Sequence, residues 1–312
     1  MSILAKLKNI FEGTQSAAQA TTAPKATPSQ VGEFYNTYNE KFVQVYGDII
    51  QAYRTTDVTK LLDYEIVSIG FTPGMKACDA GCGVCGPAIY FAQKCGIQIE
   101  ALTVSEVQKQ EAVKRITAAN LNNQVSVNVG DYHDIAGSLG KEKFDVVYFL
   151  ESFGHSFNHS KAIESAWNAL KPGGTLYIKD LFRKIAVYPE HQVKIDYEIS
   201  RINEAYRYNI AELNTVLDAM RKQGFAIMFV KTVDLKLEDF ENLTISNDFQ
   251  ELTGIAKIEN WEDYIFPVDF FEIKCYKPVN DLQYGLDKYF LQNLYWMQVH
   301  KKKQEELDYG KL

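Results

Sequence analysis

Short apolar runs alternate with amphipathic stretches through the middle of the chain. Apolar runs predict strands at 75–79, 98–104, 125–129, 144–150, 174–180, 226–230 and 270–276, and apolar residues at helical spacing predict helices at 88–95, 107–119, 160–170 and 211–223. This alternation favours parallel strands joined by right-handed crossovers. We therefore expect an α/β fold with a doubly wound, mostly parallel sheet of seven strands. Such sheets bind ligands beyond the carboxyl ends of their strands.

The segments around this core follow other patterns. Residues 1–30 include a small, polar, proline-bearing stretch that predicts a flexible leader, and residues 31–70 carry apolar residues at helical spacing, which predicts an N-terminal helical cover. Residues 71–280 form the expected core, and segments at about 181–208 and 232–266 interrupt it as lid insertions. Residues 281–312 are expected to form a helical tail.

Composition narrows the classes of function. The chain has 312 residues, and 40 acidic against 33 basic residues give a formal charge of −7, which argues against a nucleic-acid partner. No apolar run reaches the roughly 20 residues of a membrane span. The five cysteines suit a reducing compartment, so we expect a cytoplasmic protein, and the ligand count argues against zinc or another metal. The sequence is compatible with a homo-oligomer.

A glycine-rich turn joins the first predicted strand to the next helix. Gly81, Gly83 and Gly86 let a ligand approach the backbone closely and supply the G-x-G-x-x-G spacing of a dinucleotide site. Asp79, however, would repel a pyrophosphate and attract a cationic amino-acid moiety. The next strand also carries no clear acid at its tip. Both features argue against a nicotinamide cofactor.

The sequence at 79–87, DAGCGVCGP, resembles the first motif of class I S-adenosylmethionine-dependent methyltransferases, particularly the sterol C-methyltransferase branch. It departs from that branch at Cys85, where the branch has glycine. The second strand leads into TVSEVQ at 103–108, which is similar to the T-x-S-x-x-Q ending of cyclopropane fatty-acid synthases and prenyl-diphosphate C-methyltransferases. The turn KPGG at 171–174 also matches. The resemblance covers about 31–276 and implies a Rossmann-like fold with S-adenosyl-L-methionine as cofactor.

The resemblance implies roles for individual residues. Neutral groups after the second strand would take over ribose binding, and the acid after the third strand would accept from the adenine amine. The implied cofactor-binding residues are Asp79, Gly81, Gly83, Thr103, Ser105, Gln108, Asp131 and Tyr132. Glu151 and His155 follow the fourth strand and resemble an E-x-x-x-H motif, which implies that they are catalytic.

The acceptor is expected to be a small molecule held under the predicted covers. Aromatic residues are concentrated there, and we expect substrate contacts from Tyr35, Tyr38, Phe153, Tyr197, Tyr206 and Trp261. Aromatic faces and a carboxylate suit the carbocation formed when an alkene is methylated. We therefore favour C-methylation of an isoprenoid, sterol-like or lipid alkene. The alternatives are an O- or N-methyltransferase of specialised metabolism and a non-methyltransferase nucleotide-binding protein.

A prenyl diphosphate acceptor would also need phosphate partners. The 181–208 segment offers five cations for that role: Arg183, Lys184, Lys194, Arg201 and Arg207. Magnesium would usually accompany a diphosphate, but the sequence shows no dedicated carboxylate cage for it.

Overall fold

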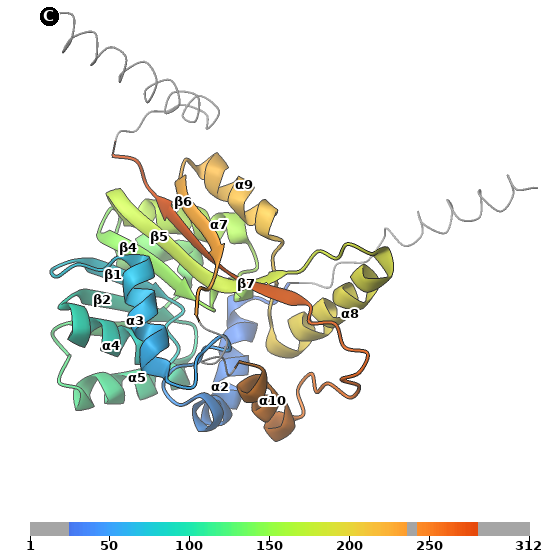
Figure 1. Ribbon diagram of the computed structural model, residues 1–312. Coiled ribbons are helices and arrows are strands. Elements are labelled where there is room, and N and C mark those ends of the chain that lie inside the picture. Colours follow the sequence, from blue (N-terminus) through green and yellow to red (C-terminus); the bar gives the residue numbers. More distant parts are fainter. Residues whose placement is uncertain (1–24, 236–241, 280–312) are drawn as a thin grey trace, which may run out of the picture.

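The sheet has seven strands in the order β3-β2-β1-β4-β5-β7-β6 (Figure 1). The computed structural model describes residues 25–235 and 242–279. The strands are β1 (Lys76–Ala80), β2 (Gln98–Thr103), β3 (Val125–Val129), β4 (Phe144–Leu150), β5 (Leu170–Arg183), β6 (Ala226–Thr232) and β7 (Val268–Tyr276). Strands β1 to β5 pair in parallel, and β7 is antiparallel to both β5 and β6. The predicted seven-stranded, mostly parallel α/β sheet is confirmed.

Helices cover both faces of the sheet. One face packs against α3 (Val58–Ile69), α4 (Gly86–Cys95) and α5 (Glu106–Ala118), and the other against α6 (Ile135–Leu139), α7 (His159–Ala169) and α9 (Leu213–Gln223). Side chains along β4 point alternately to the two faces of the sheet, which explains this division. Tyr148 packs on the face covered by α3, α4 and α5, and Phe149 on the face covered by α6, α7 and α9. Burial on both faces holds β4 at the centre, and its carboxyl end is therefore rigidly placed.

Three further helices gather at one end of the sheet: α2 (Pro28–Tyr46), α8 (Pro189–Tyr206) and α10 (Asn242–Thr253) (Figure 1). Phe42 of α2 stacks on Phe249 of α10, with 4.3 Å between ring centroids. Phe34 lies edge-on to Tyr206 of α8 at 6.2 Å. Aromatic contacts therefore join helices that lie far apart in the sequence.

The N-terminal helix begins at Pro28, before the predicted position 31. Thr27 and Gln30 form a capping box, in which the Gln30 amide donates to the Thr27 hydroxyl and the Thr27 amide donates to Gln30 Oε1. A proline in the first turn further favours this start. Residues 1–24 of the predicted leader and the predicted tail at 281–312 lie outside the described residues.

The segment predicted to interrupt the core at 181 continues as strand. Leu181 to Arg183 still belong to β5, because they pair with Val268 to Phe270 of β7. The helical part of this segment is α8, from Pro189 to Tyr206. Within the described ranges, no helix combines the length and the apolarity that a membrane crossing requires.

Candidate active site

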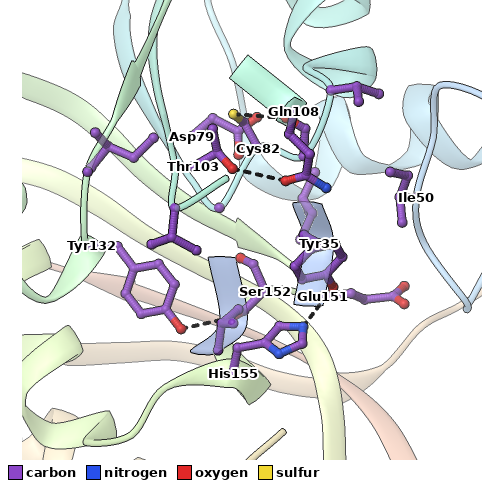
Figure 2. Close-up of a pocket in the computed structure, with 18 of the residues that line it drawn as sticks. Tyr35, Ile50, Asp79, Cys82, Thr103, Gln108, Tyr132, Glu151, Ser152 and His155 are labelled. Atoms are coloured by element: carbon purple, nitrogen blue, oxygen red, sulfur yellow. Dashed lines mark hydrogen bonds between the residues drawn. The ribbon is translucent and has the colours of Figure 1, made fainter. Parts of the chain in front are cut away.

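The first cavity lies beyond the carboxyl ends of β1, β2, β3 and β4. It encloses about 870 Å³ counted out to its open mouth. Seven of the eight predicted cofactor-binding residues line it: Asp79, Gly81, Gly83, Thr103, Gln108, Asp131 and Tyr132. We call it the cofactor cavity. Both predicted catalytic residues, Glu151 and His155, also line it (Figure 2).

The glycine turn forms the floor of this cavity. Gly81 has φ +99°, and a Cβ there would come within 2.4 Å of Ser152 Cβ. Gly83 has φ +52°, and a Cβ there would point between Ile50 and Gln108, which both line the cavity. Glycine is therefore needed at the first position for packing, and at the second it is favoured by the left-handed backbone conformation.

Asp79 supplies a buried carboxyl group next to this turn. The residue is 3% exposed, and burial raises its pKa to about 7. A cation bound beside it would favour the ionised form and lower that pKa again. The environment of Asp79 therefore suits a cationic ligand group such as an ammonium or a sulfonium.

The polar residues at the end of β2 and just after it form a hydrogen-bonded chain. The Thr103 hydroxyl donates to Gln108 Oε1 at 2.9 Å, which leaves the Gln108 amide protons for other partners. Ser105 does not line the cavity, although it was predicted to bind cofactor. Its hydroxyl caps α5 by accepting from the Gln108 amide, and donates to Asn36 of α2 at 2.7 Å. Ser105 therefore connects the N-terminal helix to the core.

Asp131 and Tyr132 follow β3 on the neighbouring wall. Burial raises the pKa of Asp131, but hydrogen bonds from the His133 amide and ring outweigh it, and the pKa lies below its usual value. Asp131 is thus held as an acceptor. The Tyr132 hydroxyl donates to the Ser152 carbonyl at 3.1 Å. Its ring forms part of the wall, and its hydroxyl is used within the protein.

Glu151 lies directly after β4 in a left-handed conformation, with φ +54°. Non-glycine residues rarely adopt this conformation, and it is concentrated at functional sites. Oε2 accepts from the Ala52 amide at 2.6 Å, and Oε1 accepts from Lys179 Nζ at 2.6 Å. Both oxygens therefore have partners, so the orientation of the Glu151 carboxyl group is fixed.

His155 is held as a neutral imidazole. Because the Arg207 carbonyl, 3.1 Å from Nδ1, can only accept, the ring proton lies on Nδ1. Nε2 then accepts from the Tyr35 hydroxyl at 2.8 Å (Figure 2). Burial lowers the pKa of His155 to about 4. The ring stacks on Tyr208 at 4.0 Å, so its orientation is fixed and an unprotonated nitrogen faces Tyr35.

A second cavity adjoins the first and encloses about 970 Å³ counted out to its open mouth. Tyr35, Ile50 and Glu151 line both cavities. The remaining wall is mostly aromatic and aliphatic, and comes from α2, β5, α8, α10, β7 and the loops that follow α2, follow α8 and precede β7: Phe42, Tyr46, Ala52, Leu181, Ile202, Tyr206, Tyr208, Gln250, Ile258, Trp261, Tyr264, Phe266, Pro267, Val268 and Phe270. We call it the acceptor cavity.

The structure divides the six predicted substrate-contacting aromatics. Tyr35, Tyr206 and Trp261 line the acceptor cavity. The other three do not line either cavity. Phe153 packs in the core against Phe149, Tyr38 packs against Phe34, and Tyr197 is 64% exposed beside Arg201. Periodicity identified an aromatic-rich region correctly, but it could not show which way each ring points.

Most cations considered for a diphosphate already have carboxylate partners. Arg183 pairs with Asp196, Lys184 with Asp269 at 3.4 Å, Lys194 with Asp263 at 2.5 Å and Arg201 with Glu198 at 2.9 Å. Arg207 donates to the Glu204 carbonyl at 2.7 Å. None of these five residues is among those that line the acceptor cavity in the described part of the chain.

Sequence reasoning missed a buried polar group beneath the site. Lys179 is fully buried and contacts Gln51, Glu65 and Glu151. A signal was present, since Lys179 lies within an otherwise apolar strand. A lysine at a buried strand position requires an anionic partner.

Comparison with known proteins identifies the family of this chain. The family model described as mycolic acid cyclopropane synthetase matches residues 57–265. The chain belongs to this family. The family is S-adenosylmethionine-dependent, so the predicted family resemblance and cofactor are confirmed. Further matches include O-, N- and C-methyltransferases, as expected of a methyltransferase family.

The individual proteins that match share only a small fraction of identical residues with this chain. The 27-O-demethylrifamycin SV methyltransferase of Amycolatopsis mediterranei is 27% identical over 164 residues, which span 50% of this chain and 60% of that protein. Among solved structures, the [4+2]-cyclase SpnF has a TM-score of 0.67 at 21% identity, over 83% of this chain and 98% of its own. A geranyl diphosphate methyltransferase structure, solved with GPP and sinefungin, has a TM-score of 0.66 at 17% identity, over 80% and 99%. At these identities the structural matches show the shared fold.

The residues present fit the cofactor of the family. The space above Gly83 and the buried carboxyl of Asp79 suit a sulfonium-bearing amino acid. Asp131 is an ionised acceptor, and Thr103 with Gln108 offers neutral hydrogen-bonding groups. This set of groups has the charge and polarity that S-adenosylmethionine requires.

Proposed function

We propose that the protein transfers a methyl group from S-adenosylmethionine to a carbon of a neutral isoprenoid, sterol-like or lipid alkene. The observation that carries the proposal is the apolar, largely aromatic acceptor cavity, which meets the cofactor cavity at Tyr35, Ile50 and Glu151. A neutral acceptor is favoured over a diphosphate because the cations of the 181–208 segment have partners of their own. Among the described residues that line the acceptor cavity, Glu151 is the one charged side chain, so this wall offers no cation to a phosphate.

The bound cofactor supplies an electrophilic methyl group on a positively charged sulfur. The alkene donates its π electron pair to that carbon, so that a C–C bond forms as the C–S bond breaks and a carbocation remains on the acceptor. The faces of Tyr35, Tyr46 and Tyr208, together with the Glu151 carboxylate, suit that cation. Loss of a proton from the acceptor to a base restores a neutral product.

His155 is the base that we assign to this step. Its Nε2 is unprotonated and is reached through the Tyr35 hydroxyl, which lines both cavities. Tyr35 takes the acceptor's proton on its oxygen as it gives its own proton to Nε2. Tyr35 therefore stays neutral, and the positive charge ends on the His155 ring. The walls exclude water that would otherwise capture the carbocation.

The same base supports a second candidate, O-methylation of a phenol or alcohol. The observation in its favour is the fixed tautomer of His155, because a base that faces Tyr35 could equally remove the proton of an acceptor hydroxyl. The two candidates differ in the atom that is methylated.

The test is an acceptor panel with trideuteromethyl-labelled cofactor. Polyprenols, sterols and methyl esters of unsaturated fatty acids are compared with prenyl diphosphates, phenols and amines by fragmentation mass spectrometry, which locates the label. We expect a labelled product from a neutral alkene and none from the diphosphate of the same chain length. Labelling of phenols alone would favour the second candidate, and preferential labelling of the diphosphate would overturn the neutral acceptor.

A further inference from the structure

Four buried residues form a polar cluster below the boundary of the two cavities: Gln51, Glu65, Glu151 and Lys179. We call it the Lys179 cluster. Lys179 Nζ is 2.6 Å from Glu151 Oε1, 2.5 Å from Gln51 Oε1 and 3.5 Å from Glu65 Oε1. It also donates to the Tyr53 carbonyl at 3.1 Å. The ammonium group therefore has four oxygen neighbours and no contact with solvent.

This arrangement keeps Lys179 charged. Burial alone would lower its pKa, but the Glu151 and Glu65 carboxylates outweigh burial and raise the pKa above its usual value. Gln51 and Tyr53 lie in the segment between α2 and α3, so Lys179 also fixes the loop whose amides bind Glu151. Lys179 thus holds Glu151 directly and holds its other partners in place.

Glu65 adds a second carboxylate to a cation that already has one. Glu65 is fully buried on α3, and it lines neither cavity in the described part of the chain. With Glu65 ionised, two carboxylates and one ammonium give the Lys179 cluster a net charge of −1. With Glu65 protonated, the cluster is neutral. Only the ionised form adds a field that attracts positive charge on the acceptor side.

We propose that Lys179 and Glu65 are positioning residues for methyl transfer: Lys179 fixes Glu151 at the boundary of the cavities, and Glu65 supplies the excess negative charge that favours a cation on the acceptor. This inference rests on the proposed function, since of the two candidate acceptors the alkene is the one that develops a carbocation. In the reaction, positive charge moves from the sulfur toward the acceptor carbon, which lies on the side of Glu151.

The groups facing Glu65 decide its titration. They are Lys179 and Tyr177 on β5, Glu151 after β4, Gln51 before α3, and Asp79 on β1. Glu272 on β7 adds to the charge around Tyr177. Burial raises the pKa of Glu65 to about 7, so the net charge of the cluster changes within the working range of many enzymes. Asp79 and Asp180 have pKa values near 7 as well, so a variant is needed to isolate Glu65.

The decisive variant is Glu65→Gln, which keeps the shape and removes the charge. With an alkene acceptor, we expect the single-turnover rate at pH 8 to fall about two- to threefold, the effect of one charge on a cation that moves from roughly 14 Å to roughly 10 Å away in a medium of effective dielectric about 20. The rise in rate between pH 6 and 8 should shrink by the same factor. Cofactor affinity should stay within twofold, and Glu65→Asp should restore part of both effects.

The control is Glu100→Gln. Glu100 on β2 pairs with Lys143, which precedes β4 and so lies toward the opposite edge of the sheet from Glu151. This variant should retain the rate and the pH profile. An unchanged rate and profile in Glu65→Gln would overturn the role of Glu65. If Lys179→Arg keeps the wild-type rate while Lys179→Gln is folded and equally active, the role of Lys179 is overturned.

The outcome separates the two proposals. Wild-type turnover of an alkene tests the proposed function, and the ratio of variant to wild type tests the Lys179 cluster. If only hydroxyl acceptors are methylated, the proposed function fails. A ratio near 1 on an alkene that the wild type does methylate contradicts the cluster alone.

Discussion

The two cavities are built in different ways. The cofactor cavity takes most of its polar groups from residues at the carboxyl ends of β1 to β4 or a few positions after them. The acceptor cavity draws its wall from α2, β5, α8, α10 and β7, and from loops, and that wall is mostly aromatic. The first depends on strand ends and turns, whereas the second depends on how distant segments pack. Changes in the first should alter cofactor affinity, and changes in the second should alter acceptor recognition.

His155 lines the cofactor cavity and contacts Tyr35, which lines both cavities. Its removal should have the largest effect. His155→Ala removes a base whose Nε2 is held ready by Arg207 and Tyr35. We expect a loss of about 10² to 10⁴ in single-turnover rate, the range for a positioned acid or base. Cofactor affinity, measured by calorimetry, should change little.

The matched control for this variant is His191→Ala, since His191 is an exposed histidine on α8. It should retain the wild-type rate. The pKa of His155 is lowered to about 4. His155→Ala should therefore not remove any step near pH 6.5 from the pH profile of the rate. Loss of such a step, or an unchanged rate, would remove its assignment as the base.

Asp79→Asn should act on the cofactor side alone. Loss of a charged hydrogen-bonding partner should weaken S-adenosylmethionine binding at pH 8 by about 10- to 100-fold. The pKa of Asp79 is raised to about 7, so the wild-type carboxyl is largely protonated at pH 6 and the difference should shrink there. Calorimetry at both pH values measures this, and Asp145→Asn, remote at the Lys171 pair, is the control. An equal difference at both pH values would contradict the titration of Asp79.

The same shift predicts a stability effect. A carboxyl whose pKa is raised on folding contributes stability below its ordinary pKa, and this contribution is lost as pH rises through the folded value. For Asp79 the window runs from 3.8 to about 7. Asp79→Asn should therefore be at least as stable as the wild type at pH 8, measured by thermal unfolding. Marked destabilisation at pH 8 would indicate an ionised, structurally paired carboxylate instead.

Trp261→Ala should act on the acceptor side alone. Trp261 is 50% exposed and lines the acceptor cavity, whereas Tyr197 is 64% exposed and does not. Loss of part of the apolar wall should raise the acceptor KM about 5- to 10-fold, which corresponds to about 1 to 1.5 kcal/mol. Tyr197→Ala should leave the acceptor KM unchanged. Equal effects of the two variants would show that aromatic content, rather than the cavity, determines recognition.

Thr103→Ala should have the smallest effect. Thr103 orients Gln108 through one neutral hydrogen bond of 2.9 Å, and such a bond contributes about 1 kcal/mol. Cofactor affinity should fall about fivefold, and Gln108→Ala should produce a similar loss. If calorimetry finds both variants unchanged, the groups after β2 have no part in cofactor binding.

The sequence predicted which residues meet in the cofactor cavity because most of them lie at a strand end or shortly after one. Once β1 to β4 are parallel neighbours, Asp79, Thr103, Asp131 and Glu151 must emerge at one edge. Ser105 shows the limit of this reasoning. A hydroxyl before a helix also satisfies backbone amides, and here it caps α5 instead of facing the cavity.

The acceptor cavity was less predictable, for physical reasons. Tyr197 and Tyr206 belong to the same helix, but only the packing of α8 against α2 decides which of them faces inward. Phe153 was placed in the core by the short helix η2 (Phe153–His155), whose turn the apolar pattern did not reveal. Lys179 was missed because its partners Gln51 and Glu65 come from a distant segment.

The central claim is that the methyl group passes from the cofactor cavity to a carbon in the acceptor cavity. Carbon NMR of the product formed with ¹³C-methyl cofactor and the best neutral alkene tests it most directly. We expect the labelled methyl to be bonded to carbon, with its formation slowed in Asp79→Asn only at subsaturating cofactor and in His155→Ala at all cofactor concentrations. A labelled methyl bonded to oxygen or nitrogen would contradict the account.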